Sequence, residues 1–290
     1  MSLPHFFLDT QIIAHESGEV FTLELTESDA RHARVLRLDT GEHIAVIDGE
    51  KDYFECEIVS FAEKLPKVRI AQKLHASIPS VSVTLFQGLA KGDKMDEVLR
   101  HTTEIGIDAY VPLVCERSVV RLEEKKAVKR VERWRAIAKS AAMQSGRVAI
   151  PRIDELTNFK QACECLSEFS CVCIFWEEAP ETCSVHDALR KHCLLQTDNG
   201  ETVRYKTGDT EAACDTCHAD TQNSVAIIVG PEGGLSQKEV DTLLASNVHA
   251  HLVSLGSSIL RTETAGVVAC ALVLYELGGL GNRRADEARV

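Results

Sequence analysis

The sequence predicts an α/β fold with a mainly parallel sheet, preceded by a small β-rich domain. From residue 81 onward, short apolar runs alternate with longer segments of helical spacing, as in α/β proteins. Residues 1–74 instead hold short β-branched runs separated by turn residues. Near the end of the chain, two glycine-bearing loops each follow a strand-like run and precede a helical segment. We therefore expect a first domain at 1–76 and a second at 77–280.

The first domain is expected to be a set of strands interrupted by one helix. Strand-like runs occupy 21–25, 43–47, 53–59 and 67–71, and Asp48-Gly49 is typical of a hairpin connection. The helix starts at the capping sequence Thr26-Glu27-Ser28-Asp29 and ends before Gly41. Its arginines form a basic stripe, which either contacts phosphate groups or pairs with the acidic residues of this domain.

The second domain begins with a strand at 81–87, after a linker that contains Pro79. The next elements are a helix that ends at Gly106, a strand at 109–114 and a long helix at 123–145. That long helix has apolar residues at helical spacing on one face and basic residues on the other. A further strand is expected at 171–176. Residues 196–223 are predicted to be a mobile insertion, because few of them are apolar, and 281–290 a disordered tail.

The last part of the second domain holds the two loops. Val225–Val229 is followed by Gly230-Pro231-Glu232-Gly233-Gly234, and a capping box starts the next helix at Ser236. The run 249–254 is followed by the second loop, and the helix after it, 265–277, carries almost no charge. We expect that helix to be buried nearly all round.

These two loops are the candidate ligand site. Ligands of open α/β sheets bind at the carboxyl ends of the strands, where glycines let a ligand approach the backbone. The alternative is that Gly233-Gly234 only makes a tight turn. No GxGxxG opens the domain, no GxxxxGK[ST] is present, and Ser236 lies in no GxSxG elbow. These absences disfavour a Rossmann dinucleotide site, a P-loop and a serine hydrolase.

Composition indicates a soluble globular protein, with 44% hydrophobic residues, 26% charged residues and a net charge of −12. The charge is uneven: residues 117–147 contain ten basic and three acidic residues, whereas 153–224 contain five and fourteen. The basic stretch either binds phosphate backbones or is a solvated helix face. With no apolar run of membrane-spanning length and no leader-like N-terminus, we expect a cytoplasmic location and no membrane association.

The eleven cysteines show no regular framework, so free thiols are expected rather than disulfides. Cys214-x-x-Cys217 lacks a second CxxC pair and sits in a polar stretch. We interpret it as a chance occurrence rather than half of a zinc site.

Taken together, these motifs resemble the RsmE family of SPOUT-class, S-adenosyl-L-methionine-dependent RNA methyltransferases, over nearly the whole chain. The two loops look like the family signatures, the second reading Leu255-Gly256-x-x-Ile259-Leu260-Arg261-x-Glu263-Thr264-Ala265. Supporting matches are Arg31-His32-x-x-x-Leu36-Arg37, Glu104-Ile105-Gly106, Glu116-Arg117-Ser118 and Gln144-Ser145-x-Arg147.

The resemblance implies a trefoil knot in the second domain and a PUA-like barrel as the first. It also implies a homodimer with the pocket near the subunit interface, and no requirement for a metal. The implied reaction is methylation of N3 of a specific uridine in small-subunit (16S) ribosomal RNA, either free or in the assembled small subunit.

The same resemblance implies that the two loops bind the cofactor. The implied cofactor-binding residues are Gly230, Pro231, Glu232, Gly233, Gly234, Leu255, Gly256, Ser258, Ile259, Leu260, Thr264 and Ala265.

Uridine N3 must lose a proton, and a fixed arginine would stabilise the resulting charge. We assign that role to Arg261, with Glu263 either orienting it or serving as general base; the alternative is a structural ion pair at a helix start. Candidate phosphate contacts are Arg31, Arg37, Lys91, Arg117 and Arg147.

One position departs from the family pattern. Ser258 stands where the family usually has arginine. A catalytically inactive RNA-binding protein of the same fold is therefore the main alternative function. An unrelated nucleotide-dependent enzyme, such as an oxidoreductase, is disfavoured by the missing dinucleotide fingerprint.

Overall fold

The computed structural model describes residues 3–75, 81–179, 184–191 and 223–280, and it divides into two compact units. The first unit joins the chain up to Ile78 with Lys139–Ile150, and the second comprises the remainder. The sequence predicted contiguous domains at 1–76 and 77–280, whereas the first unit also includes Lys139–Ile150 from the middle of the second range. The predicted insertion lies outside the described residues, apart from Asn223, as do the predicted tail and Cys214-x-x-Cys217.

A five-stranded sheet and one helix form the first unit. The strands are β1 (His5–Phe7), β2 (Phe21–Thr22), β3 (His43–Ile47), β4 (Tyr53–Ala62) and β5 (Leu65–Leu74), with α1 at Glu27–Val35 and a 3-10 helix at Ile13–His15. Their order is β1-β3-β4-β5-β2, and only the β1–β3 pair is parallel. The four predicted strands and the helix are confirmed, whereas β1 and the 3-10 helix were missed.

The end of the long helix completes the core of the first unit. Ala142 and Met143 are buried together with Phe6, Ile44 and other residues of the sheet. The Lys139 ammonium donates to Oδ2 of Asp29 at 2.8 Å, which adds a polar link to α1. The basic helix 124–145 is therefore shared between the two units, and its last two turns belong to the first.

The second unit is built on a parallel sheet of seven strands. These are β6 (Val81–Gly88), β7 (Ala109–Val114), β8 (Arg152–Ile153), β9 (Thr157–Asn158), β10 (Cys171–Phe175), β11 (Asn223–Val229) and β12 (Ala250–Val253). Their order is β12-β10-β11-β6-β7-β8, with β9 also paired to β7, and every pair is parallel. The predicted α/β class with a mainly parallel sheet is confirmed.

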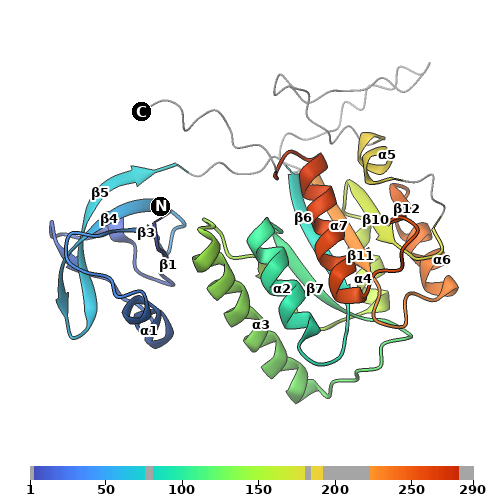
Figure 1. Cartoon of the computed structure of the whole chain (residues 1–290), viewed down its shortest axis with the longest axis horizontal. Coiled ribbons are helices and arrows are strands. Elements are labelled where there is room, and N and C mark those ends of the chain that lie inside the picture. Colours follow the sequence, from blue (N-terminus) through green and yellow to red (C-terminus); the bar gives the residue numbers. More distant parts are fainter. Residues whose placement is uncertain (1–2, 76–80, 180–183, 192–222, 281–290) are drawn as a thin grey trace. The chain divides into compact units, whose positions relative to one another are not determined.

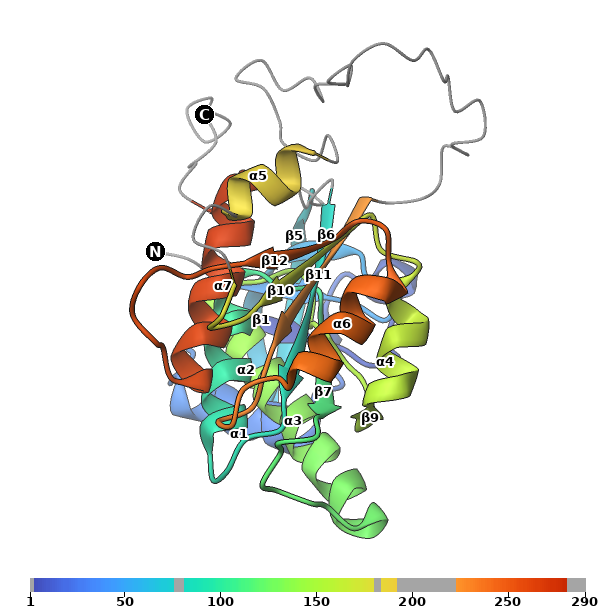
Figure 2. The same ribbon diagram turned by 90° about the vertical axis from the view of Figure 1, so that its right-hand side faces the viewer.

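Helices cover both faces of this sheet (Figures 1 and 2). One face packs against α2 (Lys94–Ile105), the first part of α3 (Glu124–Ser145), α5 (Val185–Arg190) and α7 (Thr262–Glu276). The other face packs against α4 (Phe159–Leu166) and α6 (Gln237–Ser246). The two-sided cover explains why the central strands are nearly continuous apolar runs, since each strand buries both of its faces.

Local signals determined the helix ends as predicted. Gly106 and Gly146 end α2 and α3 with φ values of +122° and +71°, a backbone region that favours glycine. At the start of α6, the Ser236 hydroxyl accepts from the Glu239 amide and the Glu239 carboxylate accepts from the Ser236 amide, so the predicted capping box is confirmed.

Helix α7 differs from its prediction in two ways. It begins at Thr262 rather than at residue 265. It is also not buried all round, because Leu272 and Tyr275 are 40% and 62% exposed. The helix packs against α2, α5 and the sheet, and among the described residues these contacts leave one apolar stripe uncovered.

Two further expectations concern topology and membranes. The trefoil knot implied by the resemblance stays a prediction. Within the described part of the chain, no helix is both long enough and apolar enough to span a membrane.

Candidate active site

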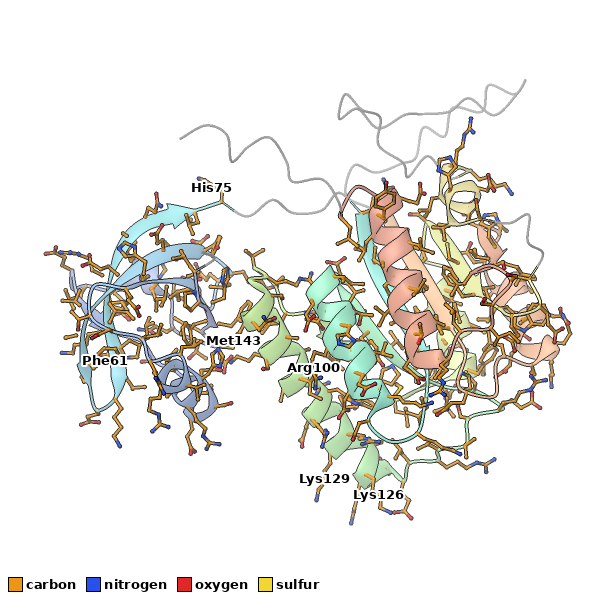
Figure 3. All side chains as sticks on the ribbon, viewed as in Figure 1. Phe61, His75, Arg100, Lys126, Lys129 and Met143 are labelled. Atoms are coloured by element: carbon orange, nitrogen blue, oxygen red, sulfur yellow. The ribbon has the colours of Figure 1, made fainter. Side chains whose placement is uncertain are left out.

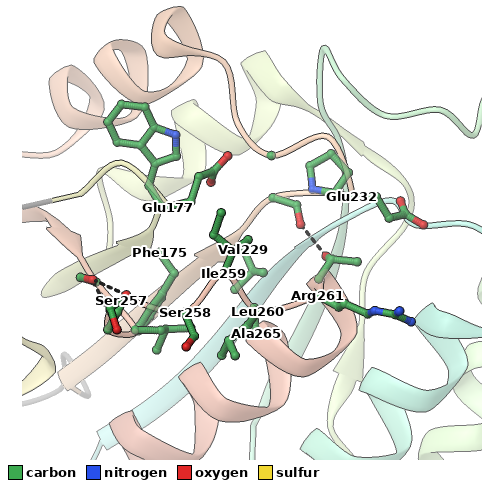
Figure 4. Close-up of a pocket in the computed structure, with 18 of the residues that line it drawn as sticks. Phe175, Glu177, Val229, Glu232, Ser257, Ser258, Ile259, Leu260, Arg261 and Ala265 are labelled. Carbon is green, nitrogen blue, oxygen red and sulfur yellow. Dashed lines mark hydrogen bonds between the residues drawn. The ribbon is translucent and has the colours of Figure 1, made fainter.

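A cavity of about 430 Å³ lies at the carboxyl ends of strands β10, β11 and β12 (Figure 4). Because the three strands are parallel neighbours, the loops that follow them meet at one edge of the sheet. Both loops singled out in the sequence line the cavity. Its lining residues are Lys94, Phe175, Trp176, Glu177, Val229, Gly230, Pro231, Glu232, Gly234, Ser254, Leu255, Gly256, Ser257, Ser258, Ile259, Leu260, Arg261, Thr262 and Ala265.

Most predicted cofactor contacts line this cavity, but two do not. Gly233 packs instead against Arg117, whose guanidinium donates to the carbonyls of Gly233 at 3.1 Å and Leu235 at 3.3 Å. Thr264 lies on the exposed side of α7. The remaining ten predicted cofactor residues, and Arg261, surround the cavity.

Close approaches of neighbouring atoms explain why glycine occupies two positions near the cavity. A Cβ atom added at Gly88 would overlap the backbone of Pro231, so the end of β6 touches the first loop directly. Gly234 has φ +69°, and a Cβ atom there would overlap the Glu177 carboxylate. Glycine at position 234 therefore permits the positive φ angle. It also leaves room for the Glu177 side chain, in the loop after β10, to pack against the first loop.

Thr262 ties three segments together beneath the cavity. Its hydroxyl donates to the Gly230 carbonyl at 2.6 Å and accepts from Nε2 of Gln87 at 2.9 Å. Thr262 and Gln87 are both buried. This hydrogen-bonded chain holds the start of α7, the first loop and the end of β6 in one arrangement.

The motif Glu116-Arg117-Ser118 braces the first loop from the other side. The Ser236 hydroxyl donates to Oε2 of Glu116 at 2.7 Å, and the Glu116 amide donates to Oε1 of Glu239 at 2.7 Å. Together with the Arg117 contacts, these bonds fix the start of α6. The Arg117 guanidinium, predicted to contact phosphate, is thus engaged in holding the loop.

Lys94 forms ion pairs with two carboxylates at the edge of the cavity. Its Nζ atom lies 3.1 Å from Oε2 of Glu263 and 3.3 Å from Oε1 of Glu232. These side chains are between 19% and 30% exposed. The Lys91 amide also donates to Oε1 of Glu232 at 2.9 Å. The ion pair of Glu263 is with Lys94, and the charge of Arg261, beside which sequence reasoning placed Glu263, acts on this carboxylate more weakly.

The pKa values reflect this clustering. Hydrogen bonding to Glu263, and then to Glu232, raises the pKa of Lys94. Burial alone would raise the pKa of both carboxyl groups, but hydrogen bonds to backbone amides and to Lys94 offset that effect. The pKa values of Glu232 and Glu263 are therefore both lowered. At neutral pH the cluster holds two carboxylates and one ammonium.

Arg261 lines the cavity with an exposed side chain and occupies the N-cap position of α7. Figure 4 shows it extending on the side of Glu232 and away from Phe175. Among the residues that the structure describes, its guanidinium has no ion-pair or hydrogen-bond partner. An unpaired cation at the rim of a cavity is available to a ligand that carries negative charge.

Sequence reasoning missed eight lining residues: Lys94, Phe175, Trp176, Glu177, Val229, Ser254, Ser257 and Thr262. The signal for several was present, because Trp176-Glu177 follows β10 and Lys94 lies just after β6, at the same edge of the sheet. The Trp176 Nε1 atom is buried, and it has no hydrogen-bond partner within the described residues. A buried donor without a partner is costly unless a ligand or water accepts from it.

The other candidate RNA contacts fall in both units. Arg31, Arg37 and Arg147 belong to the first unit, and Lys91 belongs to the second. Arg31 pairs with Glu27 at 3.3 Å on the exposed side of α1. Arg37 follows α1 with φ +54°. Lys91 is exposed. It lies beside the cavity, because its backbone amide donates to the Glu232 carboxylate.

Comparison with known proteins agrees with this architecture. Residues 77–274 match the RNA methyltransferase domain family, and residues 25–70 match the RNA methyltransferase PUA domain family. Ribosomal RNA small subunit methyltransferase E of Bacillus subtilis (strain 168) is 29% identical over 270 residues, which cover 92% of this chain and 94% of that protein. The protein of the same name from Aquifex aeolicus is 27% identical over 87% of this chain and 93% of its own length.

Solved structures show the same arrangement. A crystal structure described only as a hypothetical protein superposes with a TM-score of 0.73 at 28% identity, over 96% of this chain and all of that one. A ribosomal RNA small subunit methyltransferase E from Neisseria gonorrhoeae, solved bound to S-adenosyl methionine, has a TM-score of 0.69 at 25% identity. That match covers 94% of this chain and 97% of the other.

A parallel α/β domain of the SPOUT class, with strand-end loops around one cavity and a PUA-like domain before it, defines an RNA methyltransferase architecture. The chain belongs to the RsmE family of RNA methyltransferases.

Proposed function

We propose that this protein transfers a methyl group from S-adenosyl-L-methionine to N3 of a uridine in small-subunit ribosomal RNA, in the cytoplasm. The observation that carries the proposal is the cavity lined by both family loops, with an exposed arginine at its rim. The names of the relatives support ribosomal RNA of the small subunit as the substrate.

The residues of the cavity fit this cofactor. A volume of about 430 Å³ lies in the usual range of roughly 300–1,000 Å³ for small-molecule sites. Ile259, Leu260 and Ala265 offer apolar contacts for an adenine ring, and the loop backbone offers amides and carbonyls for the polar groups. Trp176 offers an aromatic ring, and Glu177 offers a carboxylate acceptor, to the same ligand. When bound, the cofactor supplies an electrophilic methyl group on a sulfonium.

The protein's own residues must position the target base and accept the proton that leaves N3. Uridine N3 is normally paired, so the base must be unpaired or flipped out to reach the cavity. Loss of the N3 proton places negative charge on the ring, and the Arg261 guanidinium is free to stabilise it. Glu263 holds Lys94, and Lys94 holds Glu232 at the cavity edge.

Two carboxylates therefore compete for the role of proton acceptor. Both are ionised at neutral pH, but Glu232 lines the cavity and Glu263 does not. Comparing Glu232→Gln with Glu263→Gln assigns the role. Loss of methyl transfer with unchanged cofactor affinity in one variant alone identifies that carboxylate.

The decisive experiment is incorporation of labelled methyl from S-adenosyl-L-methionine into unmodified small-subunit ribosomal RNA and into assembled small subunits. Nuclease digestion then identifies the modified nucleoside. Labelled N3-methyluridine supports the proposal, whereas label in a ribose or in another base contradicts the assigned position.

Binding without transfer under varied conditions and substrates would favour the alternative, an inactive RNA-binding protein of the same fold. Ser258 motivates this alternative, because it lines the cavity at a position where the family usually has arginine. In that case Ser258→Arg is the next variant. Gain of transfer would show that the side chain at this position limits the reaction.

We also infer that the protein works as a homodimer. The uncovered stripe of α7 runs through Thr264, Val268, Leu272 and Tyr275, which lie on one side of the helix. Ile259, in the second loop, is 85% exposed beside the start of this helix. A second copy covering the stripe would remove this apolar surface from water. Light scattering should report a dimer that Tyr275→Glu dissociates, whereas a monomeric wild type would contradict it.

A further inference from the structure

The first half of α3 carries basic residues on one flank only. At 100° per residue, Lys125, Lys129, Arg133, Lys126 and Arg130 fall within an arc of about 140°. The buried positions Val131, Trp134 and Ala138 face the sheet, next to the Arg130 side of this arc. All five arc positions are basic, so this flank has no apolar anchor of the kind that protein interfaces use.

Three of the five basic side chains have partners within the fold. Arg133 pairs with Asp96 and, at 3.7 Å, with Asp93. Arg130 donates to the Gly92 carbonyl at 3.1 Å and stacks over Trp134. Lys126 lies 3.3 Å from Glu123, with both side chains largely exposed.

Lys125 and Lys129 have no ion pair with any described residue. Both are exposed, and Figure 3 shows Lys126 and Lys129 directed away from the body of the fold at the start of α3. Their Cα atoms are about one helical turn apart, a rise of about 6 Å along the helix axis.

Two acidic residues precede the lysines at the start of α3. Glu124 stands in the first turn, where the positive end of the helix dipole favours acidic residues, and Glu123 pairs with Lys126. Lys125 and Lys129 have no such partner among the described residues, so their charges are available to an anionic ligand.

This flank is joined to the rim of the candidate active site. The Arg130 contact holds α3 against the loop that precedes α2, at Gly92. In the same loop, the exposed Lys91 donates its amide to Glu232, which lines the cavity. A line of basic residues therefore runs from the start of α3 through this loop to the cavity.

We propose that Lys125, Lys129 and Lys91 bind the phosphate backbone of the RNA strand that delivers the target base to the cavity. This proposal rests on the proposed function for the identity of the RNA. Phosphate contacts position a nucleic acid without reading its sequence, so these lysines set register and affinity rather than base choice. The Arg117 guanidinium, engaged in bracing the loop, is not part of this surface.

The test is the salt dependence of RNA binding. The full-length double variant Lys125→Gln/Lys129→Gln is compared with wild type by fluorescence anisotropy on an unmodified small-subunit RNA fragment at several salt concentrations. Each lost phosphate contact lowers the slope of log K against log salt by roughly 0.7–0.9, so two should lower it by about 1.4–1.8. Affinity near 0.1 M salt should fall by about tenfold or more. Lys91→Gln should lower the slope by about half as much.

The matched control is Lys160→Gln/Lys238→Gln, which removes two exposed lysines from α4 and α6 on the opposite face of the sheet. Cofactor affinity by calorimetry should be unchanged in all variants. A slope for the α3 variant equal to that of the control overturns the proposal, as does a wild type that binds no RNA.

The outcomes also separate this proposal from the proposed function. Salt-dependent binding that needs these lysines, without any methyl transfer, keeps the surface and rejects the activity. Full methylation by the double variant at limiting RNA rejects the surface and keeps the activity.

Discussion

The Nζ atom of Lys94 lies 3.1 Å from Oε2 of Glu263, an ion pair that joins the start of α2 to the start of α7. The same ammonium contacts Glu232 of the first loop at 3.3 Å. One lysine thus holds two carboxylates, one from the first loop and one from the start of α7. Sequence patterns placed Glu232 and Glu263 in the same candidate site, but they did not indicate that Lys94 would join the two carboxylates.

Replacing Lys94 by Met should destabilise the protein by about 1 kcal/mol, since the pairs are partly exposed and such pairs contribute little more. The carboxyl pKa values are lowered below 4.5, so their stabilisation is present above that pH and is lost as pH falls through the lowered values. The Lys94 pKa is raised above 10.5, so its contribution is present below that pH and is lost as pH rises through the raised value.

The difference in unfolding free energy between wild type and Lys94→Met should therefore be constant between about pH 5 and 10 and shrink outside that window. Urea unfolding at a series of pH values measures it. A difference that persists unchanged at pH 3 would mean that Lys94 stabilises through packing of its alkyl chain instead.

Replacing Arg261 by Ala should lower the rate of methyl transfer by about 10²–10³-fold, the usual effect of removing one group that stabilises developing charge. Because the guanidinium has no partner among the described residues, folding stability should change little. Single-turnover transfer to RNA and thermal unfolding are the two measurements. Arg261→Lys keeps the charge and should retain part of the rate, whereas a full rate in Arg261→Ala would remove this residue from the mechanism.

Replacing Gly234 by Ala should weaken cofactor binding by at least about tenfold, or roughly 1.4 kcal/mol. The new methyl group would overlap the Glu177 carboxylate and would sit at φ +69°. Gly41→Ala, in the first unit, is the matched control, because Gly41 has φ +89° but open space around the Cβ position. Adding Glu177→Ala to Gly234→Ala should recover the steric part of the loss, and calorimetry with cofactor would detect a failure to do so.

Replacing Thr262 by Val should destabilise the protein by about 1–3 kcal/mol. Valine keeps the shape but leaves the Gly230 carbonyl and the Gln87 amide without their partner in a buried site. Chemical denaturation measures this loss. Thr242→Val, at an exposed position on α6, should change the unfolding free energy by no more than about 0.5 kcal/mol. Equal effects of the two substitutions would contradict a bridging role for Thr262.

Local signals made the helices and strands of this protein predictable. Ser236 with Glu239 determines where α6 begins, and Gly106 and Gly146 determine where α2 and α3 end, through contacts within a few residues. The alternation of apolar runs and helical spacing also predicted the parallel sheet correctly. The short elements β1, β8, β9, α4 and α5 escaped, since two to eight residues carry too little periodicity to be distinguished from loops.

Which side chains are buried, and which ones form hydrogen bonds or ion pairs, was harder to predict. An apolar segment looks the same in sequence whether neighbours cover all of it or leave a stripe such as Leu272 and Tyr275 exposed. Likewise, Arg117 and Lys129 are both basic residues in a basic stretch. Only the structure shows that Arg117 holds a loop, whereas Lys129 has no ion pair among the described residues.

By itself, the sequence determined the α/β class, the two glycine-bearing loops and the family, because these depend on local periodicity and on short motifs. Tertiary structure decided that the loops after β10, β11 and β12 close on one cavity, and that Lys94 joins Glu232 to Glu263. The physical reason is that such contacts arise when parallel strands distant along the chain are hydrogen-bonded side by side. No pattern within a single segment encodes which strand lies beside which.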